Sequence, residues 1–316
     1  MSVAEYVRIL GRGPGRSRAL TKDEAAEAMR LMLAGDAAPE AIGALLMLLR
    51  MKGETADEIA GFSQAAQDAS PKLPPVDLDW PSYAAGRTRG HPWFLLSAKL
   101  VAEAGHSVLL HGFNGPDATV RKGLADAGIG IAETPDAAAL LLTRDRIAYL
   151  PLEIWHPALF GLLKLRDVLG LRSCINTVCR MLNPARAQSS VQGVFHPSYR
   201  LLQADAAALL GWQNLTVIKG GGGEFERHPA KDITGFGLRN GTPWETTVPP
   251  LINETRRLST VVESPSTDAP FPIPQEAFET AIITGTAALA LDTLGVQDSQ
   301  TRAEDLWAQR LTAQAA

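Results

Sequence analysis

Between residues 91 and 220 the chain alternates short apolar segments with longer amphipathic ones. The short segments have the length and the β-branched content of buried strands, and the longer ones have apolar residues at helical spacing. Strands alternating with helices form a mostly parallel sheet with helices on both faces, and its ligands lie beyond the carboxyl ends of the strands. The predicted strands are SVLLHG (107–112), IAYLPL (147–152), SVQGVF (190–195) and NLTVIKG (214–220), and the predicted helices are 91–105, 117–128, 156–170 and 197–211.

The first 70 residues predict a small bundle of about four helices, because Thr21 with Glu24 and Thr55 with Glu58 have the spacing of capping boxes. The stretch SPKLPPVDLDWPS (70–82) then holds four prolines in 13 residues, which favours extended chain. We therefore expect a helical domain at 1–70, a linker at 71–82 and an α/β domain at 83–316. Residues 230–272 predict an irregular or partly β excursion, followed by helices at 274–295 and 301–311.

Composition limits the classes of function. No apolar run approaches the 18 or so residues of a membrane span, and the N-terminus lacks a signal-peptide pattern, so we expect a cytoplasmic protein without a membrane partner. Cys174 and Cys179 fit a reducing compartment as buried thiols. A net charge of −4 gives no whole-chain argument for nucleic acid. No metal-ligand spacing and no catalytic constellation are present among the histidines, cysteines and carboxylates.

The stretch VIKGGGGEFERHP (217–229) places four glycines, Gly220, Gly221, Gly222 and Gly223, after a predicted strand, with Lys219 before them. The order of residues excludes a P-loop, because the lysine precedes the glycines. Two interpretations stay open: a loop whose exposed amides contact an anion, and a loop that needs positive φ angles simply to turn.

Three groups of cations are candidates for binding phosphate. Each has a simpler interpretation as a solvated surface, and Arg166 is as well placed to pair with Asp167. Trp93, beside the second group, is a candidate for stacking on a base. The groups are Arg8, Arg12, Arg16, Arg18 and Lys22 near the N-terminus; Arg87, Arg89 and His91 in GRTRGH (86–91); and Lys164, Arg166, Arg172, Arg180 and Arg186.

Several phrases resemble anthranilate phosphoribosyltransferase and its relatives, which have the class II nucleoside phosphorylase fold. They are HPALFGLLKLRDVLGLRSCINTVCRMLNPA (156–185), VQGVFHP (191–197) and ITGTAAL (283–289), after a small helical domain. The resemblance covers essentially the whole chain. It implies the α/β fold described above and a homodimer built by the helical domain.

The sequence departs from the pattern of that family at three motifs. AAGRTRGHPW (84–93) stands where the family has its GTGGD pyrophosphate turn, and LHGFNG (110–115) stands in place of KHGNR. KGGGGEFE aligns Phe225 with the aspartate and Glu226 with the glutamate of the pair that holds Mg²⁺, with Glu224 as a neighbouring carboxylate. Arg166 matches the arginine that contacts anthranilate.

This pattern of losses resembles the YbiB branch of the family, homodimers that bind DNA and RNA without evident sequence preference. The resemblance implies a non-enzymatic nucleic-acid-binding protein that uses no cofactor. Two alternatives stay open. One is a phosphoribosyl- or glycosyltransferase with a remodelled donor site, which would use Mg²⁺, and the other is a sensor of small anions that uses the glycine loop and Arg87.

Overall fold

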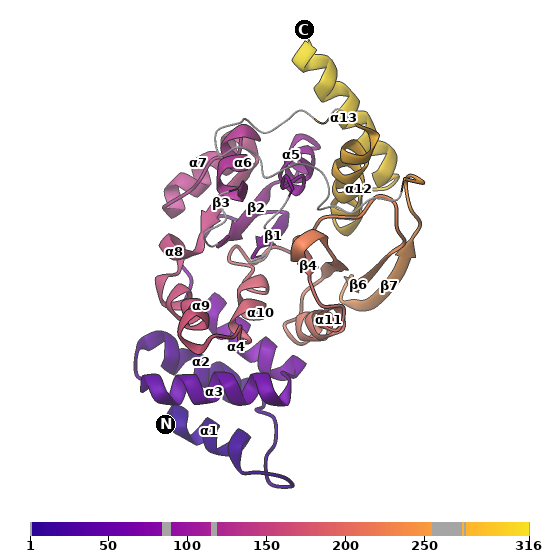
Figure 1. Cartoon of the computed structure of the whole chain (residues 1–316). Helices are drawn as coiled ribbons and strands as arrows, with labels where there is room; N and C mark the ends of the chain where they lie inside the picture. The colour runs from indigo at the N-terminus through magenta and orange to yellow at the C-terminus, as the bar shows by residue number, and fades with distance from the viewer. Residues whose placement is uncertain (1, 84–89, 115–118, 255–273, 275, 316) are drawn as a thin grey trace.

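The computed structural model describes residues 2–83, 90–114, 119–254, 274 and 276–315. Its N-terminal part is a bundle of four helices, as the capping signals predict (Figure 1). The capping boxes of Thr21 with Glu24 and of Thr55 with Glu58 are both formed, and Gly35 ends the second helix with a φ of 79°. The helices are α1 (Val3–Gly11), α2 (Lys22–Ala34), α3 (Pro39–Lys52) and α4 (Ala56–Asp68).

The second part is built on a seven-stranded sheet with the order β3-β2-β1-β4-β5-β6-β7. The pairs from β3 to β5 are parallel, and β6 and β7 add an antiparallel edge. The four predicted strands are confirmed. Of the stretch 230–272, which is predicted to be irregular or partly β, the described part contains the antiparallel pair, and residues 255–272 lie outside the described residues. The strands are β1 (Leu78–Ser82), β2 (Val108–Gly112), β3 (Ile147–Pro151), β4 (Ser189–Val194), β5 (Asn214–Lys219), β6 (Ile233–Arg239) and β7 (Thr242–Val248).

Strand β1 lies within the stretch that its prolines predict to be a linker, yet it is a central strand of the sheet. It pairs with β2 along its whole length but with β4 only through Leu78 and Asp79. Pro81, which has no amide hydrogen to donate, lies beyond the part paired with β4. The position is therefore compatible with proline although the strand is internal.

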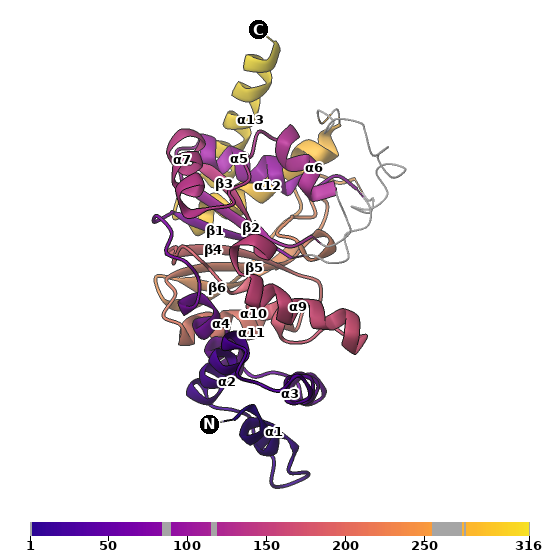
Figure 2. The same cartoon turned by 90° about the vertical axis from the view of Figure 1, so that its left-hand side faces the viewer.

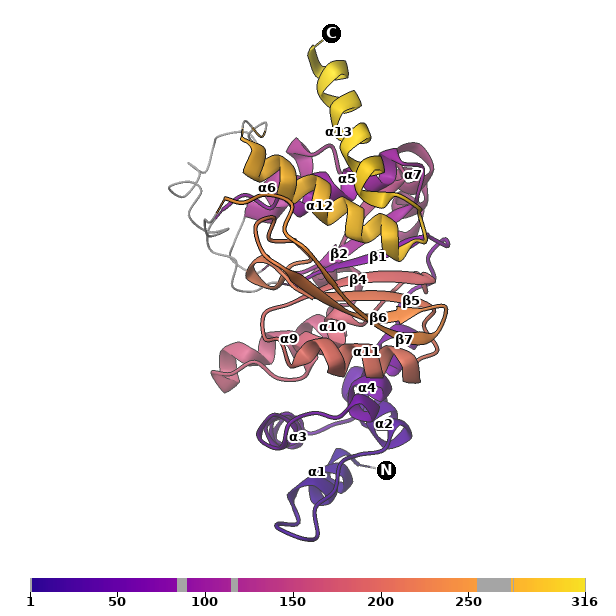
Figure 3. The same cartoon turned by 90° about the vertical axis from the view of Figure 1, so that its right-hand side faces the viewer.

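Helices cover both faces of the sheet (Figures 2 and 3). Helices α5, α6, α7, α12 and α13 lie on one face, and α9, α10 and α11 lie on the other face, toward the four-helix bundle. The predicted helices are confirmed, while α7, α8 and α10 were not predicted. The helices are α5 (Phe94–Glu103), α6 (Thr119–Asp126), α7 (Pro135–Asp145), α8 (Leu152–Trp155), α9 (Pro157–Leu169), α10 (Ile175–Arg180), α11 (Tyr199–Leu209), α12 (Ala277–Thr293) and α13 (Ser299–Ala315).

One hydrophobic core joins the bundle to the face of the sheet that α9, α10 and α11 cover. It contains Phe62 of α4, Leu159 of α9 and Ile175 of α10. His156 adds a polar link, because its Nδ1 accepts the amide of Leu159 at the start of α9 and its Nε2 lies 3.1 Å from the carbonyl oxygen of Ala66. Cys174 and Cys179 are buried free thiols. Among the described residues, no helix combines the length and the hydropathy that crossing a bilayer requires.

Candidate anion-binding site

A cleft of about 380 Å³ lies where the helical bundle meets the α/β part, beside the carboxyl end of β4. The bundle supplies Arg50 from the end of α3, and the segment from 170 to 180 supplies Arg172 and Arg180. Phe195 and Tyr199 line the cleft from the connection between β4 and α11 and from the start of α11. Three arginines therefore converge on one hollow at the edge where ligands of such sheets bind.

Arg180 is held in a fixed position by two backbone carbonyls. Its Nη1 donates to the carbonyl oxygen of Asn176 and its Nη2 donates to that of Tyr83, both at 3.2 Å. Burial lowers the pKa of Arg180, and the negative charge of Glu224 opposes that shift. The guanidinium stays charged at neutral pH and presents its charge at the wall of the cleft.

The pKa of Arg172 shows that the electrostatic potential around this residue is positive. Its pKa is lowered first by burial and then by the like charges of Arg166 and Arg50. Arg50 lies against the same segment, because its Nη1 donates to the carbonyl oxygen of Arg172 at 2.7 Å. An anion in the cleft would relieve this repulsion and is therefore the ligand that the electrostatics favour.

A second cleft of about 340 Å³ lies beside the glycine loop, at the carboxyl end of β5. Its cations are Arg200, Lys219 and Lys231, and Asp232 also lines it. Arg200 is fixed because Nη1 donates to the carbonyl oxygen of Thr234 at 3.1 Å and the guanidinium lies 4.5 Å from the centre of the Phe236 ring. Lys219 is exposed. The two clefts thus lie at the carboxyl ends of the neighbouring strands β4 and β5.

The glycine loop folds on itself. The amides of Gly220, Gly221 and Gly223 donate to the carbonyl oxygens of Val194, Glu226 and Gly220, at 3.1–3.2 Å. Gly222 and Gly223 have φ angles of 63° and 91°, in the region that favours glycine. Of the two open interpretations, exposed amides do not hold for Gly220, Gly221 and Gly223, and the need for positive φ explains Gly222 and Gly223.

The residues after the loop enter the core. Phe225 is fully buried and meets the Trp80 ring edge-on, with the ring centres 5.4 Å apart. Both neighbouring carboxylates are also fully buried. Ser82 Oγ donates to Glu224 Oε1 at 3.0 Å, and the Phe94 amide at the start of α5 donates to Glu226 Oε2 at 3.1 Å.

Comparison with known proteins identifies the family to which the chain belongs. Residues 4–70 match a family model described as "Glycosyl transferase family, helical bundle domain". An anthranilate phosphoribosyltransferase from Bacillus caldotenax is 30% identical over 231 residues, which cover 71% of this chain and 94% of the relative. The chain belongs to the anthranilate phosphoribosyltransferase family.

Two further members of the anthranilate phosphoribosyltransferase family illustrate its spread. The enzyme from Caldivirga maquilingensis is 31% identical over 212 residues, or 65% of this chain, and the matched part spans only 62% of that relative. The solved structure of the Saccharomyces cerevisiae enzyme in complex with PRPP and Mg superposes with a TM-score of 0.77 at 15% identity, covering 96% of this chain and 92% of the yeast chain. The fold and the family predicted from the sequence phrases are confirmed.

The magnesium site that the family resemblance implies does not fit the residues described here. The position aligned with the metal-binding aspartate holds the core side chain Phe225, and Glu224 and Glu226 are buried and bonded to Ser82 and to the start of α5. Across the described residues, no group of three or more histidines, cysteines and carboxylates has an arrangement that could hold a metal ion.

The predicted basic turn GRTRGH is described only at its end. Arg87 and Arg89 lie outside the described residues. His91 is 8% exposed, and its ring centre lies 5.3 Å from that of Trp93, which is 5% exposed. The burial of Trp93 argues against the prediction that its ring stacks on a base.

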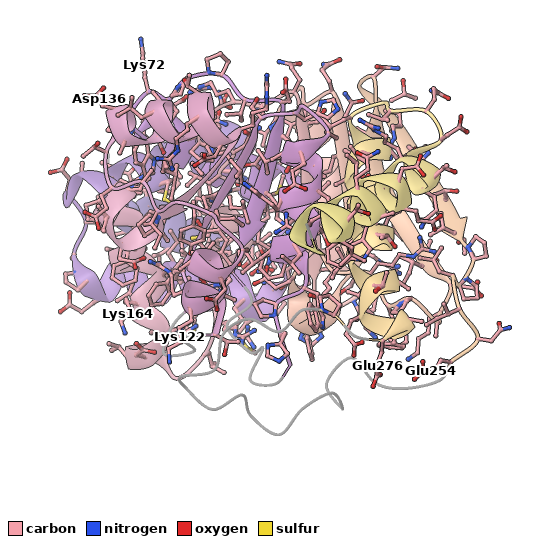
Figure 4. The ribbon with its side chains drawn as sticks, turned by 90° about the horizontal axis from the view of Figure 1, so that it is seen from above. Lys72, Lys122, Asp136, Lys164, Glu254 and Glu276 are labelled. Carbon is pink, nitrogen blue, oxygen red and sulfur yellow. The ribbon has the colours of Figure 1, made fainter. Side chains whose placement is uncertain are left out.

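Several other predicted cations are paired with carboxylates. Lys164 and Arg166 both contact Asp167, at 2.5 and 3.4 Å, and Lys164 projects from the outer edge of the molecule (Figure 4). Arg186 pairs with Asp68 at 2.6 Å. Of the predicted group, Arg172 and Arg180 are the two that line the cleft of α3 and α10.

The N-terminal cations lie apart from both clefts. The loop after α1, which carries Arg12, Arg16 and Arg18, occupies the far end of the helical bundle in Figures 1, 2 and 3. Arg18 is engaged with Glu24 at 2.6 Å, and this bond lowers the pKa of Glu24 to about 2. Arg12 and Arg16 are outside both clefts. The structure therefore separates these cations from the glycine loop.

Sequence reasoning missed Arg50, Arg200 and Lys231. Arg50 ends an amphipathic helix of the bundle, where a cation is ordinary, and Arg200 lies in the first turn of α11. None of the three positions carries a motif. They reach the clefts through the packing of segments that are distant along the chain.

Proposed function

We propose that this protein binds the phosphate groups of nucleic acid, either DNA or RNA, with little sequence discrimination, and does not transfer phosphoribosyl groups. The observation that carries the proposal is the convergence of Arg50, Arg172 and Arg180 on one cleft. Phosphate contacts fix a nucleic acid in place but do not read its sequence, so discrimination between sequences is expected to be poor.

The buried Phe225 supports the non-catalytic part of the proposal. Pyrophosphate chemistry in the family depends on magnesium, and the aligned position is now part of the core. A cleft that neutralises phosphates with guanidinium groups needs no metal ion. Binding without a cofactor is thus the expectation, and it remains a prediction.

The functional unit is proposed to be a homodimer. Met51 at the end of α3, and Val168 and Leu171 near the end of α9, are exposed apolar residues close to the junction with the bundle; Met51 and Val168 are 82% and 83% exposed. Exposed apolar residues that form a contiguous patch mark interaction surfaces, and we propose that these three do so. A Met51→Glu, Val168→Glu variant should run as a monomer in size-exclusion chromatography with light scattering, and an unchanged mass would contradict this surface.

A transferase with a remodelled donor site is the second candidate, because the relatives at about 30% identity are anthranilate phosphoribosyltransferases. Phosphoribosyl pyrophosphate is also a polyanion, and the same clefts would attract it. If this candidate is right, the protein should bind phosphoribosyl pyrophosphate only with Mg²⁺ and should release pyrophosphate when an acceptor is present.

Titration of labelled oligonucleotides of unrelated sequence at several salt concentrations tests the first proposal. Affinity should fall steeply with salt, and Arg50→Ala combined with Arg172→Ala should make the slope of log affinity against log salt shallower, by about 0.7–0.9 for each phosphate that the variant no longer neutralises. Arg144→Ala is the matched control, because Arg144 is an exposed arginine of α7 paired with Asp145. It should leave the slope unchanged.

The same protein is then titrated with phosphoribosyl pyrophosphate, with and without Mg²⁺. Absence of oligonucleotide binding at low salt, together with magnesium-dependent binding of the sugar pyrophosphate, would reject nucleic-acid binding in favour of the transferase. Binding of oligonucleotides with an unaltered slope in the double variant would place the site elsewhere on the molecule.

A further inference from the structure

Phe195 is an exposed aromatic residue at the end of β4. Its side chain is 58% exposed, whereas Trp80, Phe94 and Phe225 are buried. An exposed aromatic ring costs free energy in water, and most of this ring's surface stays open to solvent. The ring of His196 meets it at 82°, with the centres 5.0 Å apart, and so does not stack on it.

The surroundings of Phe195 are cationic. It lines the same cleft as Arg172 and Arg180. Gly223 lies beside both, because a Cβ built at Gly223 would be 3.5 Å from Phe195 Cβ and 3.6 Å from Arg180 Nη2. An aromatic surface and a fixed guanidinium are therefore adjacent, and the glycine loop meets both of them at Gly223, which has no side chain.

We propose that Phe195 stacks on an unpaired base of a nucleic acid whose phosphates occupy the arginine cleft, so that the protein binds single strands in preference to duplexes. This inference rests on the proposed function and extends it. Aromatic side chains in cationic grooves bind single strands because every base has a face to stack, regardless of sequence. Bases in a duplex are already stacked and paired, and reaching Phe195 would require extruding one.

A free aromatic acid is the competing occupant of this ring. Its ring would stack on Phe195, but its single carboxylate would pair with at most one of the three arginines. A strand supplies both a base and several phosphates, which matches a ring beside more than one cation. The single strand is therefore the better match, and the aromatic acid serves as an arm of the test.

The test uses the full-length protein and three labelled probes of equal length: oligodeoxythymidine, a chain of abasic deoxyribose phosphates, and a duplex. Phe195→Ala should weaken oligodeoxythymidine binding by about 5- to 150-fold and leave the abasic chain unchanged. Phe195→Trp should restore the preference for bases. The salt slope should be the same in all variants, because no cation is removed.

Leu201→Ala is the matched control, since Leu201 is a similarly exposed apolar residue of α11 that does not line the cleft. It should bind all three probes as the wild type does. Unfolding midpoints of the variants check that the truncation of Phe195 leaves the fold intact, as its exposure predicts.

Three results would overturn the inference. One is an equal loss on the thymidine and abasic chains after Phe195→Ala, and another is wild-type affinity for the duplex that matches or exceeds that for the single strand. The third is Phe195-dependent binding of free anthranilate with unchanged oligonucleotide binding, which would indicate an acceptor site. A wild-type protein that binds no probe at low salt would instead reject the proposed function itself.

Discussion

At the scale of single residues, Phe225 is a buried core residue at the position that the family resemblance aligns with a metal-binding aspartate. Its ring packs against Trp80 inside the core that includes α5 and α12. The side chain therefore contributes to folding, and an aspartate at this position would lose that packing. It would place a carboxyl group among the apolar side chains of this core.

We expect Phe225→Asp to lower the free energy of unfolding by at least about 3–5 kcal/mol, the usual cost of truncating a buried phenylalanine. Urea denaturation with and without MgCl₂ measures this, and Phe225→Leu, which keeps an apolar side chain, should cost less. A rise in the midpoint of Phe225→Asp on adding Mg²⁺ would instead reveal a latent metal site and favour the transferase.

His156 makes stability depend on pH. Burial lowers its pKa, and its Nδ1 accepts the amide of Leu159, so the neutral ring is the form that fits. As the pH is lowered below about 6.5, the imidazole is protonated in the unfolded chain before it is protonated in the folded protein. The free energy of unfolding therefore decreases as the pH is lowered, until the pH reaches the pKa of the folded protein. Above about pH 6.5 this contribution is constant.

The variant His156→Asn keeps a side-chain acceptor for α9 but cannot titrate. The difference in unfolding free energy between wild type and variant should therefore shrink as the pH is lowered from about 8 to about 5. Denaturant titrations across that range give the difference directly. A difference that does not change with pH would contradict the assignment of the neutral ring.

At the scale of elements, the glycine loop owes its sequence to two separate constraints. A Cβ at Gly220 would lie 1.6 Å from the carbonyl oxygen of Glu224, a backbone atom that cannot move without the loop. Gly223 has room for a Cβ at ordinary contact distance, but its φ of 91° disfavours any other residue. The first constraint is a steric clash, and the second is a backbone preference.

Gly223→Ala should therefore cost about 1–3 kcal/mol of stability, the usual cost of a strained backbone conformation, and Gly220→Ala should cost more. Thermal or chemical denaturation of the two variants ranks them. The reverse order would mean that the loop has freedom to rearrange around Gly220, and would reopen its role as an adaptable ligand loop.

The elements also show what sequence patterns can predict. Strands β2 to β5 and most helices were predicted because their apolar periodicity matches their final burial. Strand β1 was not, because Pro81 argues against an internal strand and only the register with β4 makes it acceptable. In the site, Arg172 and Arg180 were predicted from local charge, whereas Arg50 and Phe195 reach the cleft through packing that no local pattern encodes.

At the scale of the whole molecule, the distribution of charge matters more than its sum. The chain carries a net charge of −4, yet three arginines converge on one cleft. Figure 4 shows Lys122 and Lys164 at one end of an edge of the molecule and Glu254 and Glu276 at the other end. Because Lys164 is paired with Asp167, the three arginines of the cleft are the stronger attraction for a polyanion.

Arg12 and Arg16, at the far end of the bundle, provide the last prediction. A short oligonucleotide that fills the arginine cleft should bind equally well to wild type and to an Arg12→Ala, Arg16→Ala variant. A longer one should bind the variant more weakly and with a smaller salt slope, because it reaches both surfaces. Arg18→Ala is less informative, since Arg18 is engaged with Glu24. Anisotropy titrations over a series of lengths give the oligonucleotide length at which the variant begins to bind more weakly than the wild type.

A loss of affinity already present with the short oligonucleotide would mean that these arginines of one copy lie beside the cleft of another. The dimer would then form one continuous cationic surface.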